Sequence, residues 1–236
     1  MKHKPYSIFA VERPQQNIRK FNVSSSSRHQ YSPFPMDVAD YIVSFYLRDA
    51  KTIFDPFAGW GERGLACKSH DKAYIGFDTS KTAINHALET FGVCNIFNNS
   101  LKSYIPSHDG LITCPPYWNV EKEYDGDGLD KIETWEEFLK QYKKVLKRSV
   151  KKGRSGATYC VVVGDFRRQG VYYDLTFQTE KIFNELGLDP FDKVVLDQSR
   201  QYGLNKVMTL PRAKRLGYSI KIHQTLLVYK KNFTDI

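Results

Sequence analysis

Short apolar runs alternate with amphipathic stretches along most of the chain. Runs of strand length cover residues 52–54, 73–77, 94–97, 110–112, 158–163, 193–196 and 224–229. Apolar residues at helical spacing cover residues 36–47, 82–91 and 175–186, with a further helix beginning at residue 134. Strands that alternate with helices are typical of the α/β class, in which helices cover a sheet. Residues 1–35 are polar and predicted to be irregular.

Capping residues mark where several of these helices begin or end. Asp37 is predicted to cap the helix over 36–47. Thr134 opens the next long helix, and Glu137 three residues later completes a capping box. Asp174 is predicted to cap the helix over 175–186, which Gly187 closes.

The loop after the predicted strand 110–112 is stiff and carries aromatic rings. It reads Thr113-Cys114-Pro115-Pro116-Tyr117-Trp118-Asn119. Two consecutive prolines fix φ and remove two backbone donors, so the carbonyls of the loop are free to accept from a ligand. The two rings offer a flat face for a planar group. This combination suits the exocyclic amino group of a nucleobase, and the alternative is a proline-rich turn with core aromatics.

A glycine-rich turn follows the predicted strand 52–54 and leads into a helix. It reads Asp55-Pro56-Phe57-Ala58-Gly59-Trp60-Gly61-Glu62-Arg63-Gly64. Such a turn lets a ligand approach the backbone and the helix N-terminus, as in nucleotide-binding crossovers. It lacks the glycine order of a dinucleotide fingerprint and the Gly-Lys-Ser/Thr of a phosphate loop, so its leading acid favours a ligand with an ammonium group. Asp78 ends the next strand, where it can accept from ribose hydroxyls or cap the following helix together with Thr79 or Ser80.

These segments, in this order, resemble the motifs of S-adenosylmethionine-dependent DNA amino-methyltransferases. The glycine-rich turn resembles motif I, Asp78 resembles the acid of motif II, and residues 114–117 resemble motif IV. The serine run of residues 24–27 and the following residues 28–35 resemble motif X, and residues 223–230 resemble the last strand of the catalytic domain. The resemblance covers nearly the whole chain. It implies a Rossmann-like methyltransferase fold with a mostly parallel seven-stranded sheet, one antiparallel strand near the C-terminus, and helices on both faces.

The resemblance also implies a role for each residue of the site, with S-adenosyl-L-methionine as the cofactor. The cofactor-binding residues would be Ser32, Pro33 and Phe34 at its methionine end, Asp55 at its amino group, Pro56, Phe57, Gly59 and Gly61 along the turn, Asp78 at the ribose, and Asn99 near the adenine. The target base, flipped out of a duplex or supplied single-stranded, would meet Cys114, Pro115, Pro116, Tyr117 and Trp118. Tyr117 would stack on this base, with Trp118 supporting it or sharing the contact. The carbonyls of Cys114 and Pro115 would accept from the amine.

Cys114 departs from the pattern of this family. The family commonly has Asp, Asn or Ser at this position, whose side chain accepts from the target amine, and a thiol is a poor acceptor. More of that work would therefore fall on backbone carbonyls, and the target remains either adenine N6 or cytosine N4. Attack of a Cys114 thiolate on the ring, as in carbon-5 methylation, is a competing idea against which the Pro-Pro-Tyr context argues.

Composition fits this interpretation. The 236 residues are predicted to form one methyltransferase domain, and the net charge of +9 favours a polyanionic partner such as DNA. No apolar run has the length of a membrane span, and no apolar signal core follows the basic first residues. The four cysteines lack zinc spacing, so we expect reduced thiols, a cytoplasmic protein and no metal. A homodimer or a specificity partner fits the compact size.

Basic residues with interleaved tyrosines mark the predicted nucleic-acid surface. The long polar segment 198–222 carries the candidates Arg200, Lys206, Arg212, Lys214 and Arg215, and Arg167 and Arg168 follow the strand 158–163. A surface salt-bridge role is the alternative for the last pair. The lysine-rich face of the helix after Thr134 is either solvated or in contact with phosphate. The acidic stretch 121–128 lacks the spacing of a calcium loop and is predicted to be a mobile substrate loop.

Two further function classes remain open beside DNA amino-methylation. A Pro-Pro-aromatic loop also serves amines in RNA and in protein glutamine, so an RNA methyltransferase or another modifier is the second hypothesis. The third is a catalytically silent nucleic-acid-binding module that kept the fold. The two intact motifs argue against it, and Cys114 keeps it open.

Overall fold

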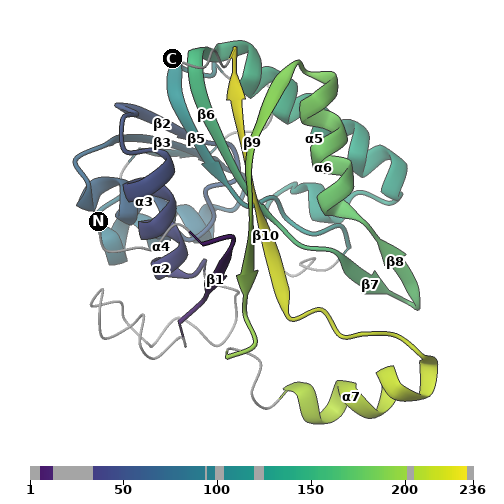
Figure 1. The fold of residues 1–236 in the computed structure, drawn as a ribbon. Helices are drawn as coiled ribbons and strands as arrows, with labels where there is room; N and C mark the ends of the chain where they lie inside the picture. The colour runs from purple at the N-terminus through teal and green to yellow at the C-terminus, as the bar shows by residue number, and fades with distance from the viewer. Residues whose placement is uncertain are drawn as a thin grey trace.

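One twisted sheet organises the molecule (Figure 1). The computed structural model describes residues 6–12, 34–93, 95–98, 104–119, 125–200 and 205–232. Within them, eight strands form the sheet in the order β1-β9-β10-β6-β5-β2-β3-β4. The strands are β1 (Ile8–Ala10), β2 (Thr52–Asp55), β3 (Ala73–Asp78), β4 (Ile96–Asn98), β5 (His108–Thr113), β6 (Gly153–Val163), β9 (Leu188–Asp197) and β10 (His223–Lys231).

The strand directions confirm the predicted sheet and add one strand to it. β10 runs antiparallel to both of its neighbours, β6 and β9, and every other neighbouring pair is parallel. The added strand is β1, which pairs with β9 at the edge of the sheet. The prediction that residues 1–35 are irregular is therefore wrong for this strand. β1 is only three residues long and mostly exposed, so it lacks a buried face that would leave a pattern in the sequence.

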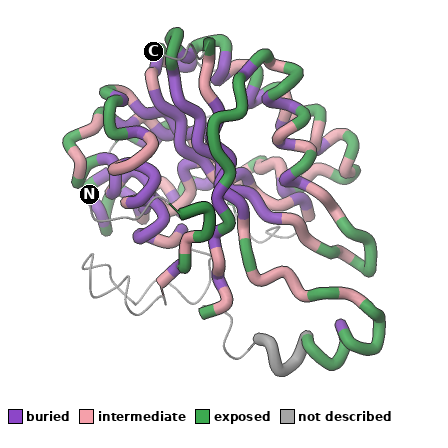
Figure 2. Tube along the Cα trace, viewed as in Figure 1, coloured by how far each residue is buried: buried purple, intermediate pink, exposed green. Residues whose placement is uncertain are grey.

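Helices cover both faces of the sheet, as predicted. One face carries α2 (Met36–Tyr41), α3 (Glu62–Ser69) and α4 (Lys81–Phe91), with a π-helical turn, η1 (Ile42–Tyr46), that continues α2. The other face carries α5 (Trp135–Lys152) and α6 (Leu175–Glu185), and the short 3-10 turn η2 (Leu129–Lys131) precedes α5. The core is divided accordingly into two buried clusters, one on each side of the sheet. The burial of the central strands is visible in Figure 2.

The helix caps agree with the sequence at some positions and differ at others. Thr134 accepts from the backbone N–H of Glu137, which is one half of the predicted capping box, whereas the carboxylate of Glu137 accepts from Lys140 and Gln141. Asp37 does not cap α2, because Pro35 occupies the cap position. The buried carboxylate of Asp37 instead accepts from the backbone N–H of Glu12 at 2.7 Å. A side chain in the first turn of a helix can thus hydrogen-bond to a segment distant in sequence, and the local sequence pattern does not reveal such a partner.

Two excursions leave the carboxyl edge of the parallel strands (Figure 1). After β6 the chain forms a two-stranded hairpin of β7 (Phe166–Arg168) and β8 (Val171–Tyr173). After β9, residues 199–222, here called the arm, carry helix α7 (Asn205–Leu216) before the chain returns as β10. The prediction of a long loop over 198–222 is therefore wrong for residues 205–216. Pro211 inside α7 and the many charged residues hide the helix from a pattern-based reading.

Helix α5 shows how charge and burial divide along one element. Phe138, Tyr142 and Leu146 are fully buried, whereas Lys140, Lys144 and the other lysines of the opposite face are exposed or half-buried. This is the amphipathic arrangement that the spacing predicts. In the described part of the chain, no helix is long and apolar enough to cross a membrane.

Gly61, at the N-terminus of α3, lets this helix approach α4 closely. Its φ is +96°, and a Cβ added there would lie 2.6 Å from the Cβ of Ala87. Gly61→Ala should therefore add a clash to the strain of a positive φ, and lower the free energy of unfolding by about 3 kcal/mol. Gly156→Ala is the matched control, because its φ of +78° is similar and no atom lies within 4 Å of the added Cβ. Urea unfolding measures both, and equal losses would contradict the close approach.

Candidate active site

The carboxylate of Asp55, the last residue of β2, is fully buried and accepts four hydrogen bonds. Oδ1 accepts from the backbone N–H of Phe57 at 3.1 Å and from the hydroxyl of Thr113 at 2.6 Å. Oδ2 accepts from Nε of Arg63 at 2.6 Å and from the hydroxyl of Tyr74 at 3.0 Å. These donors come from the glycine-rich turn, β5, α3 and β3. Asp55 therefore joins the turn to the end of the strand that carries the Pro-Pro loop.

Arg63 supplies the positive charge that this buried carboxylate requires. Its side chain is 5% exposed, donates also to the carbonyl of Phe57, and lies over the ring of Phe34 at 4.7 Å. Burial is the largest influence on the guanidinium and opposes its charge, but the charge and hydrogen bond of Asp55, together with Tyr74 and Cys114, outweigh it, so the pKa of Arg63 is raised. Phe34, from the motif X segment, thus reaches the first turn of α3. The predicted contacts of Phe34 and Asp55 with a cofactor stay predictions.

Asp78 holds the glycine-rich turn from the neighbouring strand. Its Oδ2 accepts from the backbone N–H of Gly59 at 2.7 Å, and its Oδ1 accepts from the backbone N–H of Ser80 at 2.9 Å. Burial raises the pKa of this carboxyl, while the N–H donors act in the opposite direction. Ser80 itself caps α4 by accepting from Ala83. Asp78 therefore lies beside the turn at the carboxyl edge, where the prediction of a ribose contact requires it.

The Pro-Pro loop follows Thr113, whose hydroxyl is bound to Asp55. Cys114, Pro116 and Tyr117 are half-buried, and Pro115 is buried. Trp118 is only 9% exposed, and its indole N–H donates to the carbonyl of Ile132 at 2.8 Å. The two roles predicted for Trp118 were support of Tyr117 or a shared base contact, and this burial favours support.

Tyr117 is held from two sides. Its hydroxyl oxygen accepts from Nε2 of Gln224 on β10 at 2.6 Å. Its ring lies 5.6 Å from the ring of Phe166 on the β7–β8 hairpin. Phe166 stacks on Tyr173 at 5.3 Å, and the ring of Tyr173 lies 5.0 Å from that of Trp118. An aromatic cluster thus connects the hairpin to the loop.

The acidic stretch after the Pro-Pro loop is tied to α4 in its described part. Asp125 accepts from the hydroxyl of Ser80, and from the backbone N–H of Thr82 at 3.2 Å. Gly126 has a φ of +89° and packs so closely that an added Cβ would lie 2.3 Å from the carbonyl oxygen of Thr79. Residues 125 and 126 therefore pass beside the turn that follows Asp78. Among the described residues, no group of His, Cys, Asp or Glu has the arrangement of a metal site.

The predicted nucleic-acid residues fall on the two excursions of the carboxyl edge. The guanidinium of Arg167 lies over the ring of Tyr172, at 5.2 Å, and over that of Tyr218, at 4.8 Å, so that it connects the hairpin and the arm. Lys221 lies 5.1 Å from the centre of the Tyr172 ring. The other candidates with described side chains are half-buried or exposed, and they are Arg168, Arg200, Arg212, Lys214 and Arg215.

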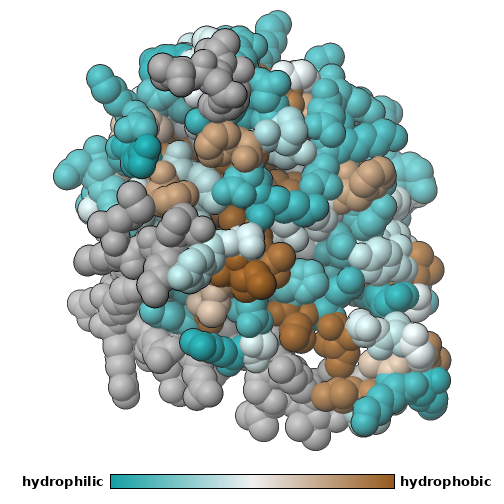
Figure 3. All heavy atoms as spheres, viewed as in Figure 1, coloured by the Kyte–Doolittle hydropathy of each residue, from teal (hydrophilic) through white to brown (hydrophobic). Residues whose placement is uncertain are grey.

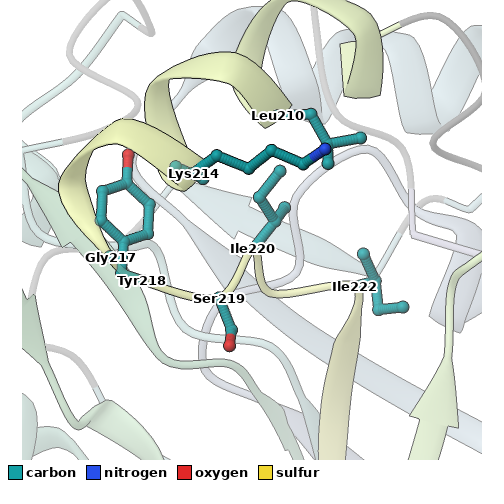
Figure 4. A pocket seen from close by; sticks show the side chains of 8 residues that line it. Leu210, Lys214, Gly217, Tyr218, Ser219, Ile220 and Ile222 are labelled. Carbon is teal, nitrogen blue, oxygen red and sulfur yellow. The ribbon is translucent and has the colours of Figure 1, made fainter.

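A shallow hollow on the arm lies between α7 and the returning segment (Figure 4). Leu210, Ala213, Ile220 and Ile222 contribute apolar surface to it. Lys214 borders the hollow and brings a positive charge beside this apolar surface. In Figure 3, apolar and hydrophilic side chains lie next to each other along the arm.

Some candidates lie outside the described residues, and several contacts were not predicted. Ser32, Pro33 and Asn99 are outside the described ranges, as is the side chain of Lys206. No role was predicted for Arg63, Thr113, Gln198 or Gln224. The first two belong to the quoted motifs, but nothing in their spacing names Asp55 as their partner. A glutamine at the start of the predicted strand 224–229, which is otherwise mostly apolar, is the one signal that could have drawn attention to Gln224.

The fold of this chain is similar to that of known methyltransferases. Solved structures of methyltransferases match most of the chain at low sequence identity. TrmN from Thermus thermophilus has a TM-score of 0.57 and 14% identity, over 90% of this chain and 52% of its own length. A putative RNA methyltransferase, PH1948 from Pyrococcus horikoshii, has a TM-score of 0.57 and 12% identity, over 94% of this chain and 100% of its own. Magnesium protoporphyrin IX methyltransferase from Synechocystis PCC 6803, solved with S-adenosylmethionine, has a TM-score of 0.51 and 10% identity, over 98% and 86%.

The chain therefore has a Rossmann-like methyltransferase fold, although it spans only about half the length of the TrmN structure (52%). Residues 3–89 also match the model of a family of N6/N4 methyltransferases described as DNA methylase. That match confirms the resemblance inferred from the motifs, and it includes the glycine-rich turn and Asp78 but ends before the Pro-Pro loop. None of the curated proteins compared with the chain matches its sequence.

Removal of Arg63 tests whether the buried ion pair holds this edge together. Arg63→Met leaves the carboxylate of Asp55 buried without its cation, so the free energy of unfolding should fall by about 3–5 kcal/mol. The double variant Asp55→Asn/Arg63→Met removes both charges and should recover part of this loss. Arg48→Met is the control, because the Arg48–Asp49 pair is exposed. Urea unfolding is the measurement, and similar losses in Arg63→Met and Arg48→Met would contradict this role.

Proposed function

We propose that this protein uses S-adenosyl-L-methionine to methylate an exocyclic amine of a base in DNA, either adenine N6 or cytosine N4. The observation that carries the proposal is the hydrogen bond between Asp55 and Thr113. It brings a glycine-rich turn of cofactor-binding type beside a Pro-Pro-Tyr loop that suits a planar amine. The family match over residues 3–89 supports the same class of substrate.

The residues at the turn fit the proposed cofactor. Gly59 has a φ of +56°, and a Cβ added there would have, among the described residues, only the Arg63 guanidinium near it, at 3.9 Å, so the backbone at Gly59 leaves room for a ligand. Gly61 is packed against α4, and it would contribute by shaping the turn. Asp78 has further acceptor capacity for ribose hydroxyls beyond the backbone N–H donors that hold it. Asp55 already accepts from four protein groups, so its contribution to the amino end of the cofactor would be mainly to hold the turn and the charge of Arg63 in place.

For methyl transfer from a sulfonium, the protein would mainly have to align the target amine with the methyl group, and acid–base catalysis would matter less. S-adenosylmethionine supplies a methyl group already activated by its sulfonium. The backbone carbonyls of Cys114 and Pro115 would accept from the target amine and draw its lone pair out of conjugation. Tyr117 would stack on the base and fix its plane, since a misplaced acceptor nitrogen reacts slowly. The base would be flipped from a duplex or supplied in a single strand.

The basic hairpin and arm would bind the nucleic-acid backbone. The guanidinium of Arg167 lies over two tyrosine rings, which restrict the position of its charge, and the hollow of the arm puts apolar surface beside Lys214. Such a mixture suits phosphates and bases of one strand. RNA is a second candidate substrate, favoured by the similarity in fold to the putative RNA methyltransferase PH1948.

Incubation with labelled S-adenosylmethionine and either DNA or RNA, followed by nucleoside mass spectrometry, tests the proposal. N6-methyladenine or N4-methylcytosine in DNA is the expected product. Preferential methyl transfer to RNA would show that RNA, the second candidate, is the substrate in place of DNA. Transfer to carbon 5 of cytosine would instead favour a thiolate mechanism at Cys114. If the protein binds nucleic acid without the cofactor and transfers no methyl group, it is a catalytically silent nucleic-acid-binding module.

Loss of the Asp78 charge should weaken binding of the cofactor. Asp78→Asn keeps the size of the side chain, but its NH2 group cannot accept, so one of the bonds from Gly59 and Ser80 is lost and the other becomes neutral. The affinity for S-adenosylmethionine should therefore fall about tenfold. Calorimetric titration measures it, and the urea midpoint shows that the variant is folded. Glu89→Gln, an exposed substitution on α4, is the control and should bind like the wild type. Equal affinities of all three proteins would argue against the ribose contact.

Charge removal on the arm should weaken nucleic-acid binding in a salt-dependent way. Lys214→Ala/Arg215→Ala removes two charges, so the slope of log affinity against log salt should decrease by about two. Fluorescence anisotropy with single-stranded and duplex oligonucleotides measures it. Lys147→Ala/Lys151→Ala makes the same change of charge on the exposed face of α5. A larger decrease of the slope in Lys147→Ala/Lys151→Ala would indicate that the nucleic acid binds at α5 and not at the arm.

A further inference from the structure

Two glutamines lie at the two roots of the arm. Gln198 directly follows β9, and Gln224 is the second residue of β10. The backbone N–H of Gln198 donates to the carbonyl of Ile222 at 2.9 Å, and Gln224 is paired with Leu196 in the sheet. The side chain of Gln198 is nearly buried, with the residue 6% exposed. The roots of the arm are therefore joined by both backbone and side chains.

The two side chains form a chain of hydrogen bonds that ends on Tyr117. Nε2 of Gln198 donates to Oε1 of Gln224 at 2.9 Å, and Nε2 of Gln224 donates to the hydroxyl oxygen of Tyr117 at 2.6 Å. Gly164 leaves the space for this contact. A Cβ added at Gly164 would lie 3.1 Å from the Tyr117 hydroxyl and 3.2 Å from Cγ of Gln224.

The order of donors along these two hydrogen bonds determines the role of the Tyr117 hydroxyl, which is the acceptor of the second bond. Because Oε1 of Gln224 is occupied by Gln198, the amide presents an N–H to Tyr117. The hydroxyl oxygen accepts this bond, so Gln224 fixes the position of the Tyr117 hydroxyl. At the same time, a fixed hydroxyl selects one rotamer of the ring. The ring contact with Phe166 restricts Tyr117 from the other side.

We propose that Gln224, oriented by Gln198, is a positioning residue that fixes Tyr117 for stacking on the target base. The inference rests on the proposed function, in which Tyr117 contacts the base. Gln224 also connects the ring of Tyr117 to the roots of the arm. A nucleic-acid strand bound by the arm would therefore be held in a fixed position relative to the ring that contacts the base. A purely structural hydrogen bond would affect stability but would not act through the Tyr117 hydroxyl.

Kinetics of methyl transfer separate these two roles. Gln224→Met keeps the length of the side chain and removes the donor, so kcat should fall about five- to tenfold while the KM for S-adenosylmethionine stays unchanged. Gln224→Glu should recover much of kcat, because its carboxylate accepts from both Gln198 and the Tyr117 hydroxyl and so keeps the ring in place. Gln198→Met should give a smaller loss in the same direction.

A double-variant cycle tests whether Gln224 acts through the hydroxyl of Tyr117. In Tyr117→Phe, which lacks the hydroxyl, the further change Gln224→Met should have no additional effect on kcat. Gln141→Met is the matched control, because Gln141 also donates from Nε2 to a neighbouring side chain, Glu137, on the exposed side of α5. Additive losses in the double variant, or equal losses in Gln224→Met and Gln141→Met, would overturn the inference.

A measurement without catalysis distinguishes failure of the inference from failure of the proposed function. With 3-fluorotyrosine placed at position 117, the fluorine resonance reports the surroundings of the ring directly. It should shift and broaden in Gln224→Met and stay unchanged in Gln141→Met. No methyl transfer by the wild type to DNA or RNA would overturn the proposed function, whereas an unchanged resonance in Gln224→Met would overturn the positioning role of Gln224.

Discussion

The buried carboxylate of Asp55 is the constraint on which the rest of the carboxyl edge depends. A charge removed from water is stable in a fold only when it is paired and fully hydrogen-bonded. Asp55 meets this requirement with four donors from the turn, β5, α3 and β3. Each donor is therefore fixed relative to the others. The glycine-rich turn and the Pro-Pro loop, far apart in the chain, are held at one distance by this single group.

The other half of the edge is built from uncharged contacts. Trp118, Tyr173 and Phe166 pack the hairpin against the loop, and Gln224 connects Tyr117 to the roots of the arm. The loop is thus held at its beginning by the hydrogen bond from Thr113 to Asp55, at its end by aromatic packing, and at the half-buried Tyr117 by an amide. A site for alignment needs such restraint, since little acid–base chemistry is required for methyl transfer from a sulfonium.

Much of the fold was predictable because its signals are local. The apolar runs ending near Phe54, Phe77 and Ile112 became neighbouring strands, and Thr134 with Glu137 marked the start of α5. The failures have physical causes as well. β1 is too short and exposed to show a pattern, α7 contains a proline, and Asp37 binds a backbone group distant in sequence.

By itself, the sequence determined the class of fold, the two motifs and the edge of the sheet at which they meet. These follow from periodicity, turn residues and the rule that parallel strands end on one side. Only the tertiary structure decided which partners each site residue has. It pairs Asp55 with Arg63 and Thr113, buries Trp118, and links Tyr117 to Gln224. Hydrogen bonds between side chains distant in sequence depend on the packing of whole strands and helices, and no local pattern in one chain encodes that packing.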